Sequence, residues 1–136
     1  MTNRQTDRRT LLDVKSLSRL KRPCIYKLIL LQVQRVEITG LEIVGPNADI
    51  TLEQAQADRL IKSKMFLGRG IVSWSGNNIF IHHNKVHHCP HSGIRVDNGD
   101  YIAIEDNEVY SNTWWGSSAE SAIVIAEATN IDQNDG

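Results

Sequence analysis

The chain has 136 residues, of which 40% are apolar and 23% charged, so it forms one domain at most and has enough apolar side chains for a core. No apolar run reaches the roughly 18 residues of a membrane-spanning helix, and no signal peptide is legible in the chain. The net charge of −1 hides an asymmetry, because Lys and Arg gather in residues 1–22 and acidic residues prevail after them. Two cysteines are too few for a disulfide framework.

The amino-terminal segment, residues 1–22, is a basic arm. Such an arm could contact nucleic acid or anionic lipid, but a solvated tail explains the same charges, and we predict neither nucleic acid nor membrane as a partner. Within it, "LLDVKSLSRL" (11–20) places four leucines at helical spacing, which predicts an amphipathic helix able to cap the following domain. These are Leu11, Leu12, Leu17 and Leu20. The next apolar run, "CIYKLILLQV" (24–33), predicts a buried strand.

Four segments of the remaining chain repeat one pattern of alternating apolar residues. The segments 70–88 and 93–111 align without a gap at an offset of 23 residues. Shorter copies occur at 36–44 and, at an offset of 29 from the second segment, at 122–131. A period of two, frequent β-branched residues and regular Asn or Gly breaks predict three short strands in each copy. Since one copy cannot bury its apolar face alone, we expect the copies to stack as coils whose equivalent strands pair in parallel.

The alignment predicts two columns of stacked side chains. One outward position of the third strand reads Glu42, Lys85 and Glu108, which alternate in sign and would attract one another across neighbouring strands. The bend before that strand carries Asn84 above Asn107. Asn tolerates a left-handed backbone, and its amide can bond to the amide above it, so we interpret both residues as structural.

The segments "GIRVDNGDYIAIEDNEVYSN" and "NIFIHHNKVHHC" resemble the repeats of right-handed parallel β-helix proteins of the pectate-lyase-like superfamily, over about residues 33 to 131. The expected fold is therefore all-β, a right-handed parallel β-helix of about three to four coils within residues 23–136. The resemblance implies a carbohydrate-active protein, extracellular or at the cell surface, with polysaccharide as partner and calcium as a candidate cofactor. Its matching residues are core and bend positions, which do not specify an activity.

The connections between coils differ in length and are the expected place of function. The longest is a helical insertion at about 46–69, in which Thr51 and Gln54 have the spacing of a helix capping box. This predicts a short helix over about 52–63 that lies across the coil.

Two adjacent tryptophans, Trp114 and Trp115, lie in the last connection, residues 112–121. Exposed aromatic rings of this kind either stack on sugar rings or close the junction between a loop and the coil. We therefore treat both as candidate ligand contacts and keep loop packing as the alternative.

The outer face of the first strand of each coil is where enzymes of this superfamily usually place their groove. By the resemblance, a lyase would use an arginine or lysine as base beside calcium held by acids, and a hydrolase would use paired carboxylates. Neither set is complete, and the candidate catalytic residues are Arg95 and Asp97, which could equally form a solvated ion pair. The candidate substrate-binding residues are Trp74, Trp114, Trp115, His91 and Glu127.

A histidine-rich stretch, "HHNKVHHCPH" (82–91), raises metal binding as a further alternative. Zinc requires three or four converging nitrogen or sulfur ligands, and on the predicted coil only His88, Cys89 and His91 lie near one corner. Their spacing matches no recognised zinc pattern, so we predict no metal site and interpret the histidines as a polar surface with local hydrogen bonds.

Two functions of different classes remain open. The chain is either part of a lyase or hydrolase acting on acidic glycans, or a non-catalytic β-helix module that binds glycan or serves as a structural shaft. The sequence stops partway round a predicted coil, so we expect a piece of a larger protein, or self-association at the carboxyl-terminal edge of the coil.

Overall fold

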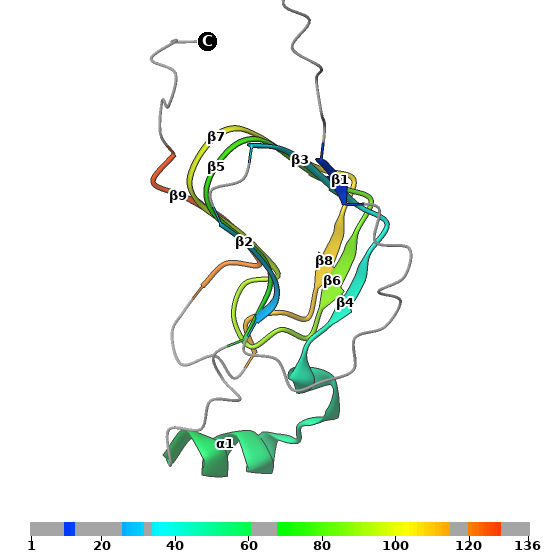
Figure 1. The fold of residues 1–136 in the computed structure, drawn as a ribbon. Helices are drawn as coiled ribbons and strands as arrows, with labels where there is room; N and C mark the ends of the chain where they lie inside the picture. The colour runs from blue at the N-terminus through cyan, green and yellow to red at the C-terminus, as the bar shows by residue number, and fades with distance from the viewer. Residues whose placement is uncertain (1–9, 13–25, 32–33, 61–67, 115–119, 129–136) are drawn as a thin grey trace, which may run out of the picture.

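The computed structural model describes residues 10–12, 26–31, 34–60, 68–114 and 120–128 (Figure 1). Strands dominate this part of the chain. The elements are β1 (Thr10–Leu12), β2 (Tyr26–Leu31), β3 (Gln34–Thr39), β4 (Glu42–Val44), a 3-10 helix (Pro46–Asp49), α1 (Leu52–Leu60), β5 (Arg69–His82), β6 (Lys85–His87), β7 (Ile94–Glu105), β8 (Glu108–Tyr110) and β9 (Ile123–Ala126). Among the described residues, no helix is long and apolar enough to cross a membrane.

The strands form two parallel sheets that wind as a coil (Figure 1). In the larger sheet the order is β1-β3-β5-β7-β9, and β2 pairs with the first half of β5. In the smaller sheet the order is β4-β6-β8. Each strand pairs in parallel with its equivalent one coil away, which confirms the predicted stacking of the repeats.

The register of the strands agrees with the sequence alignment. Val36 pairs with Ile79, which in turn pairs with Ile102. In the last described coil, Ile94 pairs with Ile123, as the changed offset predicted. From β2 to β9 the spacing between the strands of a coil is constant, so the differences in coil length arise in the connections that follow β4, β6 and β8.

Strands β5 and β7 each run along two sides of the coil as one bent strand. Ser75 and Asn78 of β5 have φ of 58° and 55°, and the equivalent Asn98 and Tyr101 of β7 have φ of 52° and 48°. Residues in this left-handed region turn the chain sharply. The three predicted sides therefore exist, but the first two belong to one bent sheet, and β4, β6 and β8 form the third.

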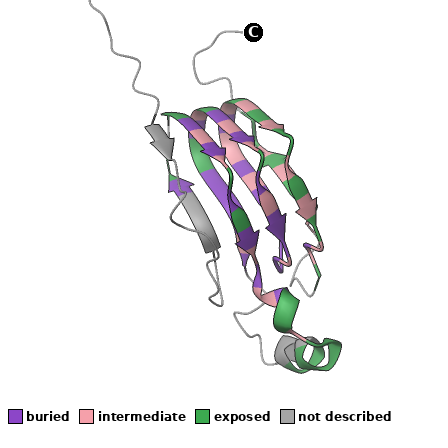
Figure 2. Ribbon diagram, turned by 90° about the vertical axis from the view of Figure 1, so that its right-hand side faces the viewer, coloured by how far each residue is buried: buried purple, intermediate pink, exposed green. Residues whose placement is uncertain are grey.

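The core lies on the inner face of the coil, where buried Ile and Val side chains of successive coils stack. Figure 2 shows buried positions, in purple, recurring on neighbouring strands. Ile71 and Ile94 are fully buried in one such column, and Val96 is fully buried in the next. Each buried side chain of this size contributes about 1.5–3 kcal/mol relative to an exposed one. The equivalents in the last described coil, Ile123 and Ile125, are exposed, and no described strand pairs with β9 on its outer edge.

Asparagine amides form the predicted ladder at the bend before the third strand. Asn84 Oδ1 accepts a hydrogen bond from the Leu41 backbone N–H (3.1 Å), and Asn107 Oδ1 accepts one from Asn84 Nδ2 (3.0 Å). The prediction that these asparagines take the left-handed backbone is wrong. The left-handed residue lies one position earlier in each coil, at Gly40, His83 and Asp106.

The charged column of the third strand is in the predicted register. Lys85 pairs with Glu42 on one side and with Glu108 on the other, and its Nζ lies 3.8 Å from Glu108 Oε2. Glu42 Oε1 lies 3.5 Å from His87 Nε2 instead. Since the Lys85 and Glu108 side chains are largely exposed, this pair contributes about 1 kcal/mol at most.

The amino-terminal segment differs from the prediction. Thr10–Leu12 is a strand that pairs in parallel with β3, so the expected helix over 11–20 is wrong at Leu11 and Leu12. The remaining residues of that segment lie outside the described part of the chain. The predicted strand at 24–33 is confirmed at Tyr26–Leu31, and it starts the first coil several residues before the resemblance placed it.

The helix of the insertion is confirmed at Leu52–Leu60, and its further predicted residues lie outside the described part of the chain. The capping box is present, because the Thr51 backbone N–H donates to Gln54 Oε1 (3.0 Å) and the Gln54 N–H donates to Thr51 Oγ1 (3.2 Å). The helix does not lie across the coil: Leu52 is exposed, and Figure 1 shows α1 projecting beyond the ends of β4, β6 and β8.

Candidate functional site

Outward residues of the first side of the coil form the candidate site. Trp74 of β5 pairs with Asp97 of β7. Arg95 lies two residues before Asp97 and so projects from the same face of the strand. The structure thus brings Trp74, Arg95 and Asp97 together, as the alignment predicted. Val72, which pairs with Arg95 in the neighbouring coil, is fully buried.

Arg95 and Asp97 form a bidentate ion pair. Arg95 Nε donates to Asp97 Oδ2 (2.7 Å), and Arg95 Nη2 donates to Asp97 Oδ1 (2.8 Å). The hydrogen bond to Asp97 raises the pKa of Arg95 above its ordinary value, against a smaller opposing effect of burial. Arg95 therefore remains a cation, and its planar guanidinium is held in one orientation.

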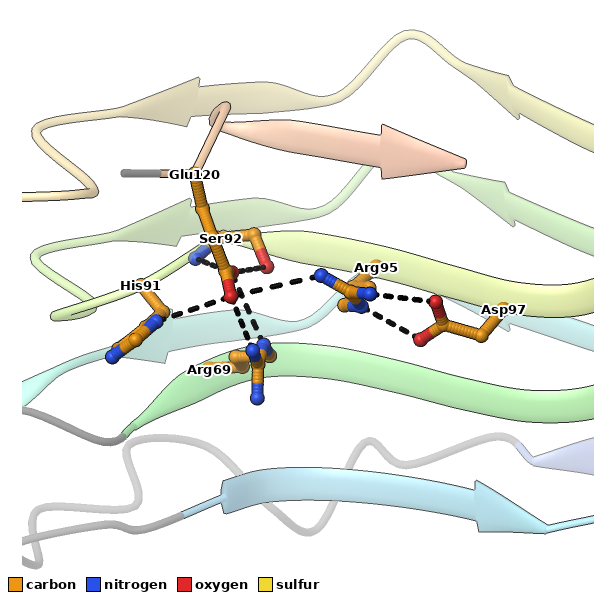
Figure 3. Close-up of polar contacts among 6 residues, drawn as sticks. All are labelled: Arg69, His91, Ser92, Arg95, Asp97 and Glu120. Atoms are coloured by element: carbon orange, nitrogen blue, oxygen red, sulfur yellow. Dashed lines mark hydrogen bonds and ion pairs between the residues drawn. The ribbon is translucent and has the colours of Figure 1, made fainter. Parts of the chain in front are cut away.

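Glu120 lies at the centre of a second set of contacts that sequence reasoning missed (Figure 3). Its carboxylate accepts hydrogen bonds from Arg69 through Nε (3.1 Å) and Nη2. It also accepts hydrogen bonds from Ser92 through the backbone N–H (3.2 Å) and the hydroxyl (3.0 Å). Since the side chain of Glu120 is only 9% exposed, these bonds replace water around a buried charge.

The same carboxylate reaches two further residues. Glu120 Oε1 lies 3.2 Å from His91 Nδ1, whose ring is 4% exposed, and 3.6 Å from Arg95 Nη1. Burial alone would raise the pKa of Glu120, but hydrogen bonds from Arg69, Ser92 and His91 outweigh it and lower the pKa to about 2. The network therefore joins the Arg95–Asp97 pair to the last connection through a fully ionised carboxylate.

An open hollow of about 380 Å³ lies beside this network. It is lined by Arg69, Trp74, Ser75, Arg95, Asp97, Asn98 and Glu127. Four of the predicted site residues thus share one hollow, namely Trp74, Arg95, Asp97 and Glu127. His91 is buried against Glu120 and does not line it.

Trp114 of the last connection does not line this hollow. Trp114 is exposed, and its backbone carbonyl accepts a hydrogen bond from Asn47 Nδ2 in the other long connection. Trp115 lies outside the described part of the chain.

The charges of the hollow balance. Arg69 and Arg95 contribute two positive charges to its lining, and Asp97 and Glu127 contribute two negative charges. Glu120 adds a further negative charge behind the two arginines. Among the residues that the structure describes, the site therefore has no excess of positive charge with which to attract an anionic ligand.

The described residues do not fit a metal ion. Among them, no group of three or more His, Cys, Asp or Glu side chains is placed to hold one, so the calcium implied by the resemblance has no matching ligand set here. The same holds for His88, Cys89 and His91, the trio considered for zinc. Cys89 is a buried free thiol, and His91 faces Glu120.

A coil of parallel strands with stacked asparagines and isoleucines defines the class of parallel β-helix proteins. The model of one family, the right handed beta helix region, matches residues 26–135, and the chain belongs to this family. No curated protein and no solved structure matches the chain.

The repeat alignment contained a signal for the missed residues. Extending the offset of 29 places Glu120 over His91, and the offset of 23 places Arg69 under Ser92. A carboxylate stacked beside an imidazole and near an arginine predicts a polar network at this corner. The signal was weak because Glu120 lies in a connection of variable length.

Proposed function

We propose that the chain is a non-catalytic β-helix module that binds a neutral polysaccharide in the hollow beside Trp74. The observation that carries this proposal is the composition of that hollow. Trp74 is 44% exposed there and offers an aromatic face, while Arg95, Asp97 and Glu127 supply hydrogen-bonding groups around it. Sugar rings combine an apolar face with hydroxyl groups, and sites of this composition recognise both.

The protonation states of the polar groups support binding over cleavage. A lyase needs a base, but the bond to Asp97 raises the pKa of Arg95 and makes proton uptake by this residue unfavourable. A hydrolase needs a carboxylic acid that is protonated near neutral pH, but the pKa of Glu120 is about 2. Asp97 is engaged by Arg95 through both oxygens. Fixed ions of this kind orient hydroxyl groups without exchanging protons.

The balanced charge of the hollow favours a neutral sugar over a uronate. Each arginine is already paired, Arg69 with Glu120 and Arg95 with Asp97, so a uronate would have to compete with an existing partner. Glu127 would repel it further. Because polysaccharides occur mainly outside the cell, the proposal includes an extracellular or cell-surface place of action, in line with the family resemblance.

A glycan array tests the proposal directly. The protein would be applied to neutral and uronate-containing oligosaccharides beside the variants Trp74→Ala and Trp114→Ala. We expect retention on neutral glycans that Trp74→Ala abolishes and Trp114→Ala leaves unchanged, because Trp74 lines the hollow and Trp114 does not. An absence of retention on all glycans would contradict the proposal.

A second assay separates binding from catalysis. The protein would be incubated with uronate polymers, with and without calcium, and the absorbance of new unsaturated ends would be recorded. Reducing ends released from neutral polysaccharides would be measured in parallel. Product in either assay that Arg95→Ala or Asp97→Ala removes would establish an enzyme and overturn the non-catalytic proposal.

A further inference from the structure

A second hollow, of about 440 Å³, opens on the second side of the coil. Phe80 of β5 and Ala103 of β7, which are paired outward residues, both line it. The small side chain of Ala103 leaves space beside the Phe80 ring. Tyr101, which is 44% exposed, lines the same hollow and supplies a second ring. The hollow therefore has aromatic surface that solvent reaches.

Polar groups surround these rings and are held in place by neighbouring residues. Glu37 Oε1 lies 2.8 Å from His82 Nε2. The His82 ring also stacks on Phe80, with ring centroids 4.1 Å apart and an angle of 24° between the planes. Both a carboxylate and an aromatic ring of the hollow are thus positioned before any ligand binds, which reduces the entropy lost on binding. Arg35 balances the charge of Glu37 in the lining.

The backbone of this hollow is unusual for its residue types. Arg35, Asn78 and Tyr101 occupy equivalent positions of three coils, with φ of 57°, 55° and 48°. Asn is common in this left-handed region, whereas Arg and Tyr are disfavoured because their β-carbon crowds the backbone. Stability alone would favour Gly or Asn at all three positions. Arg35 and Tyr101 thus have a backbone conformation that Gly or Asn would take at lower cost, and both side chains line the hollow.

We propose that this hollow is a second subsite for the same neutral polysaccharide, an inference that rests on the proposed function. The two hollows lie on the same coils. Ser75 and Asn98 line the first hollow, and Asn78 and Tyr101 line the second. Along β5, Asn78 follows Ser75 by three residues, and along β7, Tyr101 follows Asn98 by three residues. Three residues of extended strand span about 10 Å, and the bend makes this separation shorter, so one sugar chain can reach both hollows round the corner of the coil. Occupation of the first subsite raises the effective concentration of the sugar at the second.

The test compares oligosaccharides of different length. The affinity of the intact chain would be measured by calorimetry for cello-, xylo- and manno-oligosaccharides of two to eight units, beginning with the series retained on the array. We expect the affinity to rise about tenfold from the shortest to the longest member. Tyr101→Asn should remove this gain, whereas Tyr101→Phe, which keeps the ring, should keep it.

Thermal unfolding of the same variants separates binding from folding. Because Asn tolerates the left-handed backbone, Tyr101→Asn should unfold at the same temperature as the wild type or higher. Equal affinity of Tyr101→Asn and wild type for the longest oligosaccharide would overturn the second subsite while the Trp74 site stands. Affinity that does not change with length would do the same. If no member of any series binds, the proposed function fails and this inference fails with it.

Discussion

Glu120 lies over His91 at the equivalent position of the next coil, with Oε1 3.2 Å from Nδ1 of the imidazole. The same carboxylate accepts hydrogen bonds from Ser92 beside His91 and from Arg69 one coil earlier. The Glu120 side chain therefore connects three coils and attaches the last connection to the stacked strands (Figure 3). Because Arg95 is also within 3.6 Å of it, this residue positions one edge of the proposed binding site.

Replacing Glu120 by Gln should destabilise the protein. The amide keeps the shape of the side chain but removes its negative charge, so the Arg69 guanidinium loses a charged partner. We expect the free energy of unfolding in urea to fall by roughly 1–3 kcal/mol. Glu127→Gln, at an exposed position in the lining of the neighbouring hollow, is the control and should change stability by about 0.5 kcal/mol or less. Equal effects of the two substitutions would contradict the role assigned to Glu120.

The stability should also decrease in acid because of Glu120. Its pKa is lowered from 4.5 to about 2 in the folded protein, so as the pH falls the unfolded chain binds the proton first. The contribution of this carboxylate is therefore fully present above pH 4.5 and is lost as the pH falls toward 2. Urea unfolding of wild type and Glu120→Gln from pH 7 downward would measure this. The difference between them should shrink over that window, and a constant difference would be inconsistent with the lowered pKa.

Removal of the Asn84 side chain should lower the stability of the whole β-helix. Asn84 is buried, accepts from the Leu41 N–H and donates to the Ile38 carbonyl (2.9 Å), so Asn84→Ala leaves both groups without partners. We expect a loss of about 1–3 kcal/mol in the free energy of unfolding. Asn107→Ala is the matched substitution one coil later, where solvent can replace the lost bonds more easily. It should have a smaller effect, and the reverse order would show that the ladder is not the stabilising element.

Removal of Asp97 should change which sugars bind. In Asp97→Ala the Arg95 guanidinium loses its bidentate partner, and the hollow gains one net positive charge. We expect retention of uronate oligosaccharides that the wild type does not hold, and a decrease of this retention as salt is added. Glu108→Ala makes the same charge change on the third side and is the control. Uronate binding in both variants would assign the effect to total charge rather than to the hollow.

The stacking of the coils could be predicted, because β-branched residues recur with a period of two. This spacing gives each strand one apolar face, which only a neighbouring coil can help to bury. Which residue of the bend has the positive φ could not be predicted. Asp106 and Asn107 are adjacent, and both residue types tolerate a left-handed backbone. The hydrogen bonds decide between them, since only the amide of Asn107 can accept from one coil and donate to carbonyls nearby, and its neighbour takes the positive φ.

The local pattern of Leu11 and Leu12 predicted a helix, but these residues pair with β3. An open strand edge offers backbone hydrogen bonds that outweigh a modest helical preference. The Arg95–Asp97 pair could be predicted from the sequence, because residues two apart in a strand project from the same face. The position of Trp114 could not be predicted. The path of a long connection depends on contacts such as the hydrogen bond from Asn47 to the Trp114 carbonyl, and no periodic sequence pattern encodes such contacts.

From β2 to β9, the length variation between coils falls at one corner, after β4, β6 and β8. The long connections from the first and third coils leave the shaft there and contact each other through Asn47 and the Trp114 carbonyl. The connections at this corner could therefore become longer or shorter, or be exchanged, without changing the register of the stacked strands. Proteins that share this coil could therefore differ in these connections while the geometry of their stacked strands stays the same.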